Sequence, residues 1–78
     1  MKERTPHIIV TFHTTAEAMA TEAACKKAAL PGRLISAPRS LSADCGIAWC
    51  SPLSARGALE QIIGEAKIEI AGLHELAV

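Results

Sequence analysis

Near the start of the chain, the segment HIIVTF at positions 7–12 is rich in apolar residues. Every second side chain there is apolar, so Ile8, Val10 and Phe12 would share one face of an extended segment. β-Branched and aromatic residues of this kind favour strands. We therefore predict a first strand over 7–12 with one buried face.

The segment that follows has the features of a helix. Thr14 precedes Glu17 by three positions, which is the spacing of an N-terminal capping box. An alanine-rich run comes next, and the Pro-Gly pair at 31–32 would stop it, so we predict a helix from Thr15 to about Ala29. The sequence does not decide which face of this helix is buried. The two alternatives are a stripe of Met19 and Ala23 and a stripe of Ala18, Cys25 and Ala29.

Two short apolar segments predict two more strands. They are RLIS at 33–36 and GIAWC at 46–50, and a proline-interrupted, serine-rich loop at 37–45 joins them. Along the later strand the side chains would alternate between faces, with Ile47 and Trp49 on one and Ala48 and Cys50 on the other.

A second helix and a last strand complete the pattern. Ser51 and Pro52 have the order of an N-cap followed by proline at the first helical position. From there to about Ala66, apolar residues recur at helical spacing, namely Ala55, Leu59, Ile62, Ile63 and Ala66. The closing segment predicts a strand around Leu73 to Leu76, with Gly72 as a turn.

The order of these elements is β-α-β-β-α-β, the split βαβ pattern of ferredoxin-like folds. We therefore predict an α+β fold with a four-stranded antiparallel sheet and two helices on one of its faces. With 78 residues the chain has room for a single domain, which we place at 1–78.

Charge and composition narrow the function classes. Eight basic and eight acidic residues cancel and are scattered, so the chain lacks the basic patch of a nucleic-acid or anionic-lipid binder. The short apolar run near the start falls below the roughly 7–15 residues of a signal peptide and the roughly 20 of a membrane span. Three cysteines, an odd number, fit a reducing compartment, so we expect a cytoplasmic protein without a membrane partner.

Cys45 is the strongest candidate for a reactive group. It ends the serine-rich loop and precedes Gly46, which leaves steric room on one side. A reactive cysteine needs positive charge or hydrogen-bond donors near its thiolate, and Arg39 and Ser42 offer these. The carboxylate of Asp44 acts in the opposite sense, because it disfavours a second anion nearby. The alternative is that Cys45 is an ordinary small residue at a hairpin edge.

The other two cysteines have a structural explanation. We expect Cys50 to pack within its strand, but it is also a candidate second thiol that resolves or shares a persulfide with Cys45. In an extended strand the five residue steps from Cys45 to Cys50 span roughly 16 Å, too far for a disulfide without rearrangement. Cys25 falls in the middle of the first predicted helix, where packing is its expected role.

Signatures of metals and cofactors are missing from the sequence. The cysteines and histidines have neither C-x-x-C nor H-x-x-x-H spacing, and the glycines form no phosphate-binding loop. The sequence also places no general base beside Cys45. We therefore expect no metal and no cofactor, and we leave open whether the protein is an enzyme.

Three segments resemble one family: IIVTFHTTAEAMATE, RLISAPRSLSADCGIAW and IEIAGLHEL. Through them nearly the whole chain is similar to the small selenium/sulfur carrier-like proteins of bacteria and archaea. The most specific part is a Pro-Arg, Leu-Ser and Cys-Gly run, formed here by Pro38, Arg39, Leu41, Ser42, Cys45 and Gly46. Asp44 and the Trp49-Cys50 pair depart from the family pattern.

The resemblance implies that one cysteine holds sulfur or selenium as a persulfide or perselenide, and Cys45 matches that position. Arg39, Ser42 and Gly46 would support it, with Cys50 as a candidate second thiol. Such a carrier implies donor and acceptor proteins, with a cysteine desulfurase-like donor among them. It requires neither a base nor a cofactor.

Two other functions stay open. One is a non-catalytic ferredoxin-like interaction or regulatory module, whose open sheet face binds a partner even after thiol alkylation. The other is a redox switch in which Cys45 and Cys50 form a disulfide. Because a four-stranded domain this small often pairs through its sheet, a homodimer is a further expectation.

Overall fold

The computed structural model describes residues 5–38, 41 and 46–77 of the chain. Its elements are β1 (Pro6–Thr11), α1 (Thr15–Lys27), β2 (Arg33–Ser36), β3 (Ile47–Pro52), the single 3-10 turn η1 (Leu53–Ala55), α2 (Arg56–Ala66) and β4 (Gly72–Ala77). This order confirms the predicted α+β, ferredoxin-like arrangement.

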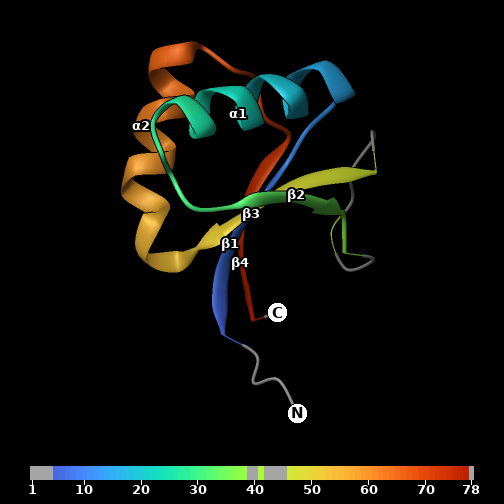
Figure 1. Ribbon diagram of the computed structural model, residues 1–78. Coiled ribbons are helices and arrows are strands. Elements are labelled where there is room, and N and C mark those ends of the chain that lie inside the picture. Colours follow the sequence, from blue (N-terminus) through green and yellow to red (C-terminus); the bar gives the residue numbers. More distant parts are fainter. Residues whose placement is uncertain (1–4, 39–40, 42–45, 78) are drawn as a thin grey trace.

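The four strands form one antiparallel sheet in the order β2-β3-β1-β4. Both α1 and α2 lie on the same side of this sheet, as Figure 1 shows. The two central strands, β1 and β3, therefore carry the most buried residues, while β2 and β4 form the edges.

The core between sheet and helices is built from the predicted alternation of β1. Ile8, Val10 and Phe12 are fully buried there, as expected. Register places Val10 opposite Trp49 of β3, and that indole is almost fully buried in the same cluster. The helices contribute small or aliphatic side chains to it, namely Ala18, Cys25, Leu59 and Ile63.

Helix α1 begins as predicted and ends two residues early. Thr14 and Glu17 form the capping box, each side chain bonding the other's backbone N–H. At the other end Ala29 adopts φ of 57°, and the Leu30 N–H donates to the Cys25 carbonyl. This is a Schellman motif, so the helix stops at Lys27, before the Pro-Gly pair that the sequence pattern had suggested as its end.

The same helix settles which stripe faces the core. Ala18, Thr21 and Cys25 are buried, whereas Met19 is 53% exposed. Thr21 is tolerated in this position because its hydroxyl donates to the Glu17 carbonyl at 3.0 Å.

Two local predictions were wrong. Ser51 and Pro52 do not start a helix; they are the last residues of β3, and α2 begins at Arg56 without a side-chain cap. Gly72 is not a turn but the first residue of β4, paired with Thr11. Pairing with β1 explains both differences, because it extends β3 past its predicted end and makes β4 begin before its predicted start.

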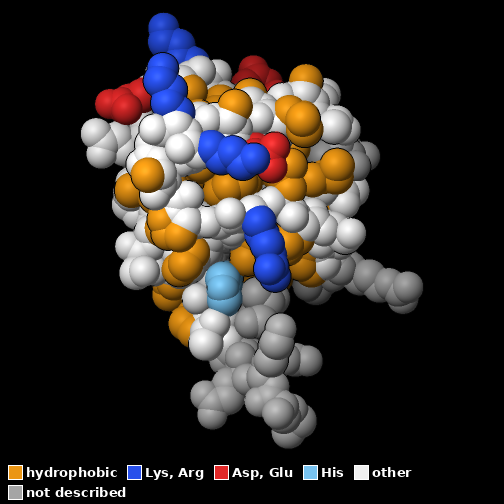
Figure 2. Space-filling model, in the orientation of Figure 1, with side chains coloured by type: hydrophobic (Ala, Val, Ile, Leu, Met, Phe, Trp, Pro, Cys, Tyr) orange, Lys and Arg blue, Asp and Glu red, His pale blue; other side chains and the backbone are white. Residues whose placement is uncertain are grey.

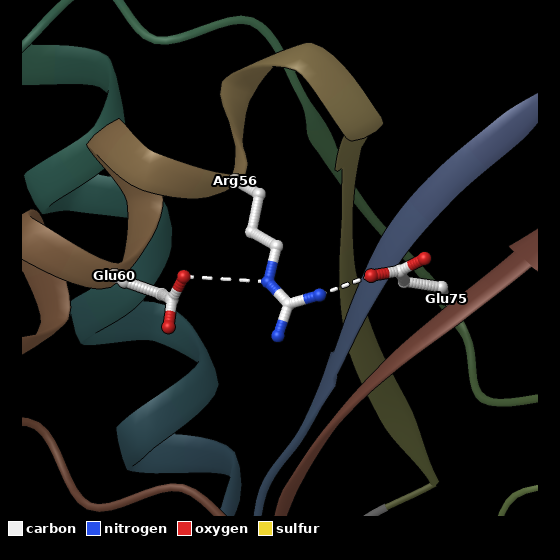
Figure 3. A network of polar contacts seen from close by, with 3 residues as sticks. All are labelled: Arg56, Glu60 and Glu75. Atoms are coloured by element: carbon white, nitrogen blue, oxygen red, sulfur yellow. Dashed lines mark hydrogen bonds and ion pairs between the residues drawn. The ribbon is translucent and has the colours of Figure 1, made fainter.

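Arg56 joins α2 to the sheet. Its guanidinium donates to the carboxylates of Glu60, one turn along the helix, and of Glu75 in β4 (Figure 3). A cation at a helix N-terminus opposes the helix dipole, and the two carboxylates offset that effect.

The face of the sheet opposite the helices also has buried residues. Ile9, Ala48 and Cys50 form a second cluster there, with Leu41 from the β2–β3 connection packed against it. Other half-buried side chains around it are Ile35, Ala37 and Leu76. This face is therefore less open than the sequence pattern suggested, because a residue of the connecting segment lies on it.

Within the part of the chain that the structure describes, neither helix has the length and apolar composition needed to cross a membrane.

Candidate functional site

The structure describes only part of the predicted site. Cys45, Arg39 and Ser42 lie outside the described residues, so their predicted roles stay predictions. Gly46 and Cys50 are described, and they lie in different surroundings.

The described base of the β2–β3 connection is closed by one hydrogen bond. The Ala37 N–H donates to the Gly46 carbonyl, with an N···O distance of 3.0 Å. Gly46 is exposed, has φ of +75°, and would meet no atom within 4 Å if it carried a Cβ. Glycine is therefore favoured here by backbone conformation rather than by close packing against described residues.

Leu41 is the one described residue between Pro38 and Gly46. Its N–H donates to the Pro38 carbonyl at 2.9 Å. Its side chain packs against the cluster of Ile9, Ala48 and Cys50. Within the family-like run, Leu41 therefore lies on the sheet face opposite the helices.

Cys50 lies in β3, as predicted, and only 7% of it is exposed. Register places it directly between Ile9 of β1 and Arg33 of β2, so the three side chains share one row of that face. Burial raises the pKa of the Cys50 thiol above its ordinary value of 9.0, and the nearby Arg33 charge partly opposes this rise. The thiol is therefore mainly protonated near neutral pH, which makes Cys50 a weak nucleophile.

Cys25 is fully buried in the core between the sheet and the helices, but because α1 ends at Lys27 it lies in the last turn of the helix rather than in the middle. Burial raises the pKa of this thiol as well. A buried, protonated thiol of this kind packs as a small apolar group.

A hollow of about 420 Å³ opens beside Cys50. Its lining combines one thiol, one arginine, one histidine and mainly apolar neighbours: His7, Pro31, Gly32, Arg33, Ile35, Cys50 and Pro52. On the face seen in Figure 2, a histidine lies close to a basic side chain among apolar atoms. Sequence reasoning missed this hollow, because its lining comes from three separate segments that only the strand register brings together.

No group of three histidine, cysteine, aspartate or glutamate side chains that could hold a metal ion occurs among residues 5–38, 41 and 46–77.

Comparison with known protein families identifies one match over nearly the whole chain. The family model described as "Putative Se/S carrier protein-like" matches residues 7–75. The chain belongs to this family. The match confirms the resemblance carried by the three sequence segments, and the matched range contains the Cys-Gly pair at 45–46.

Comparisons with curated proteins and with solved structures gave no match to this member of the Se/S carrier-like family.

Proposed function

We propose that this protein carries sulfur or selenium on Cys45, as a persulfide or perselenide, and passes it from a donor to an acceptor enzyme. The observation that carries the proposal is membership of the Se/S carrier-like family over residues 7–75. Cys45 is favoured because it stands in the most specific family-like run of the sequence, directly before Gly46.

The transfer step needs only a thiolate. The Cys45 thiolate attacks the terminal sulfur of a donor persulfide, a new S–S bond forms, and the donor's S–S bond breaks. The donor leaves as a thiolate, and the sulfur now ends a Cys45 persulfide. The reverse attack by an acceptor thiolate unloads the carrier. Electrons balance without an external oxidant or reductant.

The described surroundings of Gly46 support this role. The hydrogen bond between Ala37 and Gly46 holds the ends of the connection together, and Gly46 itself is exposed, with room for a Cβ among the described residues. A partner enzyme must approach a carrier thiol closely, so an open neighbouring residue is an advantage. In the proposal Arg39 and Ser42 stabilise the thiolate by charge and hydrogen bonding.

Cys50 has a secondary place in the proposal. Its burial and raised pKa argue against an activated second thiol, and its pairing with Cys45 stays a prediction. We further propose that the protein acts in the cytoplasm, as a carrier rather than as a stand-alone enzyme, with a cysteine desulfurase-like donor. Homodimer formation is an expectation that size-exclusion chromatography with light scattering would test.

The direct test is loading by a cysteine desulfurase and cysteine, followed by intact-mass spectrometry and peptide mapping. We expect wild type to gain the mass of one sulfur atom on Cys45, and Cys45→Ser to gain none. The matched control is Cys25→Ser, which removes a buried thiol and should load normally. Equal sulfur uptake by wild type and Cys45→Ser would overturn the proposal.

Two further variants define the site. Arg39→Gln and Ser42→Ala should slow loading without abolishing it, since they remove supporting groups and leave the carrying thiol. Replacing cysteine by selenocysteine as the substrate of a suitable lyase separates sulfur from selenium, because the mass added to Cys45 differs between the two elements.

A further inference from the structure

The hollow beside Cys50 has an unusual balance of charge. Arg33 supplies a permanent positive charge and His7 an imidazole, whereas none of the lining residues that the structure describes is acidic. No ion pair links Arg33 to a carboxylate within residues 5–38, 41 and 46–77. The hollow therefore presents a cation whose charge the described residues leave unneutralised.

The position of Arg33 follows from strand register. It lies directly opposite Cys50 across the β2–β3 pair, where facing side chains are close neighbours. Its positive charge partly opposes the rise in the pKa of the Cys50 thiol that burial causes. A negatively charged group bound to Arg33 would therefore lie beside Cys50.

His7 borders the hollow from β1. Its Nδ1 lies 2.8 Å from the Thr5 carbonyl oxygen, and since a carbonyl can only accept, Nδ1 carries a proton. The other ring nitrogen, Nε2, forms no hydrogen bond with a described residue. It is thus available to a polar group of a ligand.

The remaining lining is apolar. Pro31, Ile35 and Pro52 contribute to the walls, and Gly32 adds no side chain. A volume of about 420 Å³ lies within the range of small-molecule sites. The lining thus fits a ligand with one anionic end and a short apolar body. Inorganic phosphate and sulfate have no apolar part, so they fit this lining less well.

We propose that this hollow binds small organic carboxylates. The planar guanidinium of Arg33 pairs with the carboxylate, the apolar part of the ligand contacts Ile35 and Pro52, and the bound molecule covers the Cys50 thiol. This site lies outside the carrier function proposed for Cys45, and neither depends on the other.

Alkylation of Cys50 tests the charge selectivity of the hollow. Iodoacetate and iodoacetamide differ in charge but react alike: the sulfur forms a bond to carbon, iodide leaves, and the thiol proton passes to the buffer. Peptide fragmentation in a mass spectrometer follows Cys50 separately from Cys45. We expect Arg33→Gln to lower the iodoacetate-to-iodoacetamide rate ratio by about fivefold, because the charge that attracts the anion is removed.

The iodoacetate-to-iodoacetamide rate ratio separates binding of the anion from the intrinsic reactivity of the Cys50 thiol. Removing Arg33 also changes the pKa of Cys50, but this change affects both reagents equally and cancels in the ratio. The matched control is Arg56→Gln, which removes an arginine that is not part of the hollow and should leave the ratio unchanged. A ratio that Arg33→Gln does not alter would overturn the proposal.

Competition tests the ligand class with the wild-type protein. Rising concentrations of 3-methylbutanoate should slow the reaction of iodoacetamide with Cys50, whereas the neutral amide of the same acid should not. Inorganic phosphate should protect less than 3-methylbutanoate. Equal protection by the acid and its amide, or none by the acid, would contradict carboxylate binding.

Discussion

The indole N–H of Trp49 donates a hydrogen bond to the hydroxyl of Ser51, two residues along β3, at 2.7 Å. That hydroxyl in turn donates to the carbonyl of Pro31 at 2.8 Å. This chain of two hydrogen bonds ties a central strand to the segment between α1 and β2. It also satisfies the only polar atom of a fully buried indole.

Loss of the Ser51 hydroxyl should therefore destabilise the fold. In Ser51→Ala the Trp49 N–H and the Pro31 carbonyl lose a buried partner, and we expect the free energy of unfolding to fall by about 1–3 kcal/mol. Urea unfolding followed by Trp49 fluorescence measures this. The exposed Ser54 is the control, and Ser54→Ala should change stability by less than about 0.5 kcal/mol. Equal effects of the two substitutions would contradict a structural role for this hydrogen bond.

Gly32 should not tolerate a side chain. A Cβ there would lie 2.5 Å from Trp49 Cζ2, 2.6 Å from Ser51 Oγ and 2.7 Å from the Cys50 carbonyl oxygen, and φ is +153°. We expect Gly32→Ala to lower the free energy of unfolding by about 2 kcal/mol or more.

Gly64 is the matched control for that substitution. It lies in α2, and a Cβ there meets no atom within 4 Å. Gly64→Ala should raise the free energy of unfolding by roughly 0.5–1 kcal/mol, because alanine restricts the unfolded chain and favours helix. Chemical denaturation of both variants measures these changes. A Gly32→Ala protein as stable as wild type would contradict the prediction, because it would show that the close contacts can relax.

The ion pair between Arg56 and Glu75 should add only modest stability. Their side chains are 42% and 50% exposed, so water and salt screen the attraction. A double-mutant cycle with Arg56→Met and Glu75→Gln should give a coupling energy of about 0.2–1 kcal/mol that shrinks as salt rises. The same cycle with Glu65, roughly 13 Å further along α2, should give none. A coupling to Glu75 that salt leaves unchanged would refute this description.

Alkaline pH should destabilise the protein through its buried thiols. Burial raises the folded-state pKa of Cys25 and Cys50 above 9.0, so above that pH the unfolded chain releases protons that the folded protein retains. The two thiols contribute their full share of the free energy of unfolding below about pH 9, and this contribution is lost as pH rises through the folded-state pKa. The loss is at most about 1.4 kcal/mol per pH unit for each thiol.

Unfolding free energies between about pH 8 and pH 11 test this pH dependence. The slope with pH should be shallower in Cys25→Ala and Cys50→Ala than in wild type, whatever their stability at neutral pH. Slopes identical to that of wild type would show that neither thiol is linked to folding in this range.

Sequence reasoning succeeded where the signal is local. The placement of Ile8, Val10 and Phe12 at every second position is enough to predict β1 and its buried face, and the spacing of Thr14 and Glu17 predicts where α1 begins. The family-like segments predicted the family that the comparison confirmed.

Sequence reasoning failed where contacts with a distant segment of the chain determine the local structure. Ser51 has the local features of a helix cap, but its hydroxyl is bonded to Trp49 and Pro31, and pairing with β1 keeps it in β3. The buried stripe of α1 could not be read from alanines alone, since packing on the sheet determines whether Met19 or Cys25 is covered.

By itself the sequence determined the order of strands and helices, the fold class and the family, because periodicity, capping and the Cys-Gly run are properties of contiguous residues. Tertiary structure alone decided that Arg33, Cys50 and His7 border one hollow, since these residues are brought together by register across β2, β3 and β1. It also decided the chemical state of Cys50, because the pKa of a thiol depends on burial and on neighbouring charge, and both arise only when the strands pair.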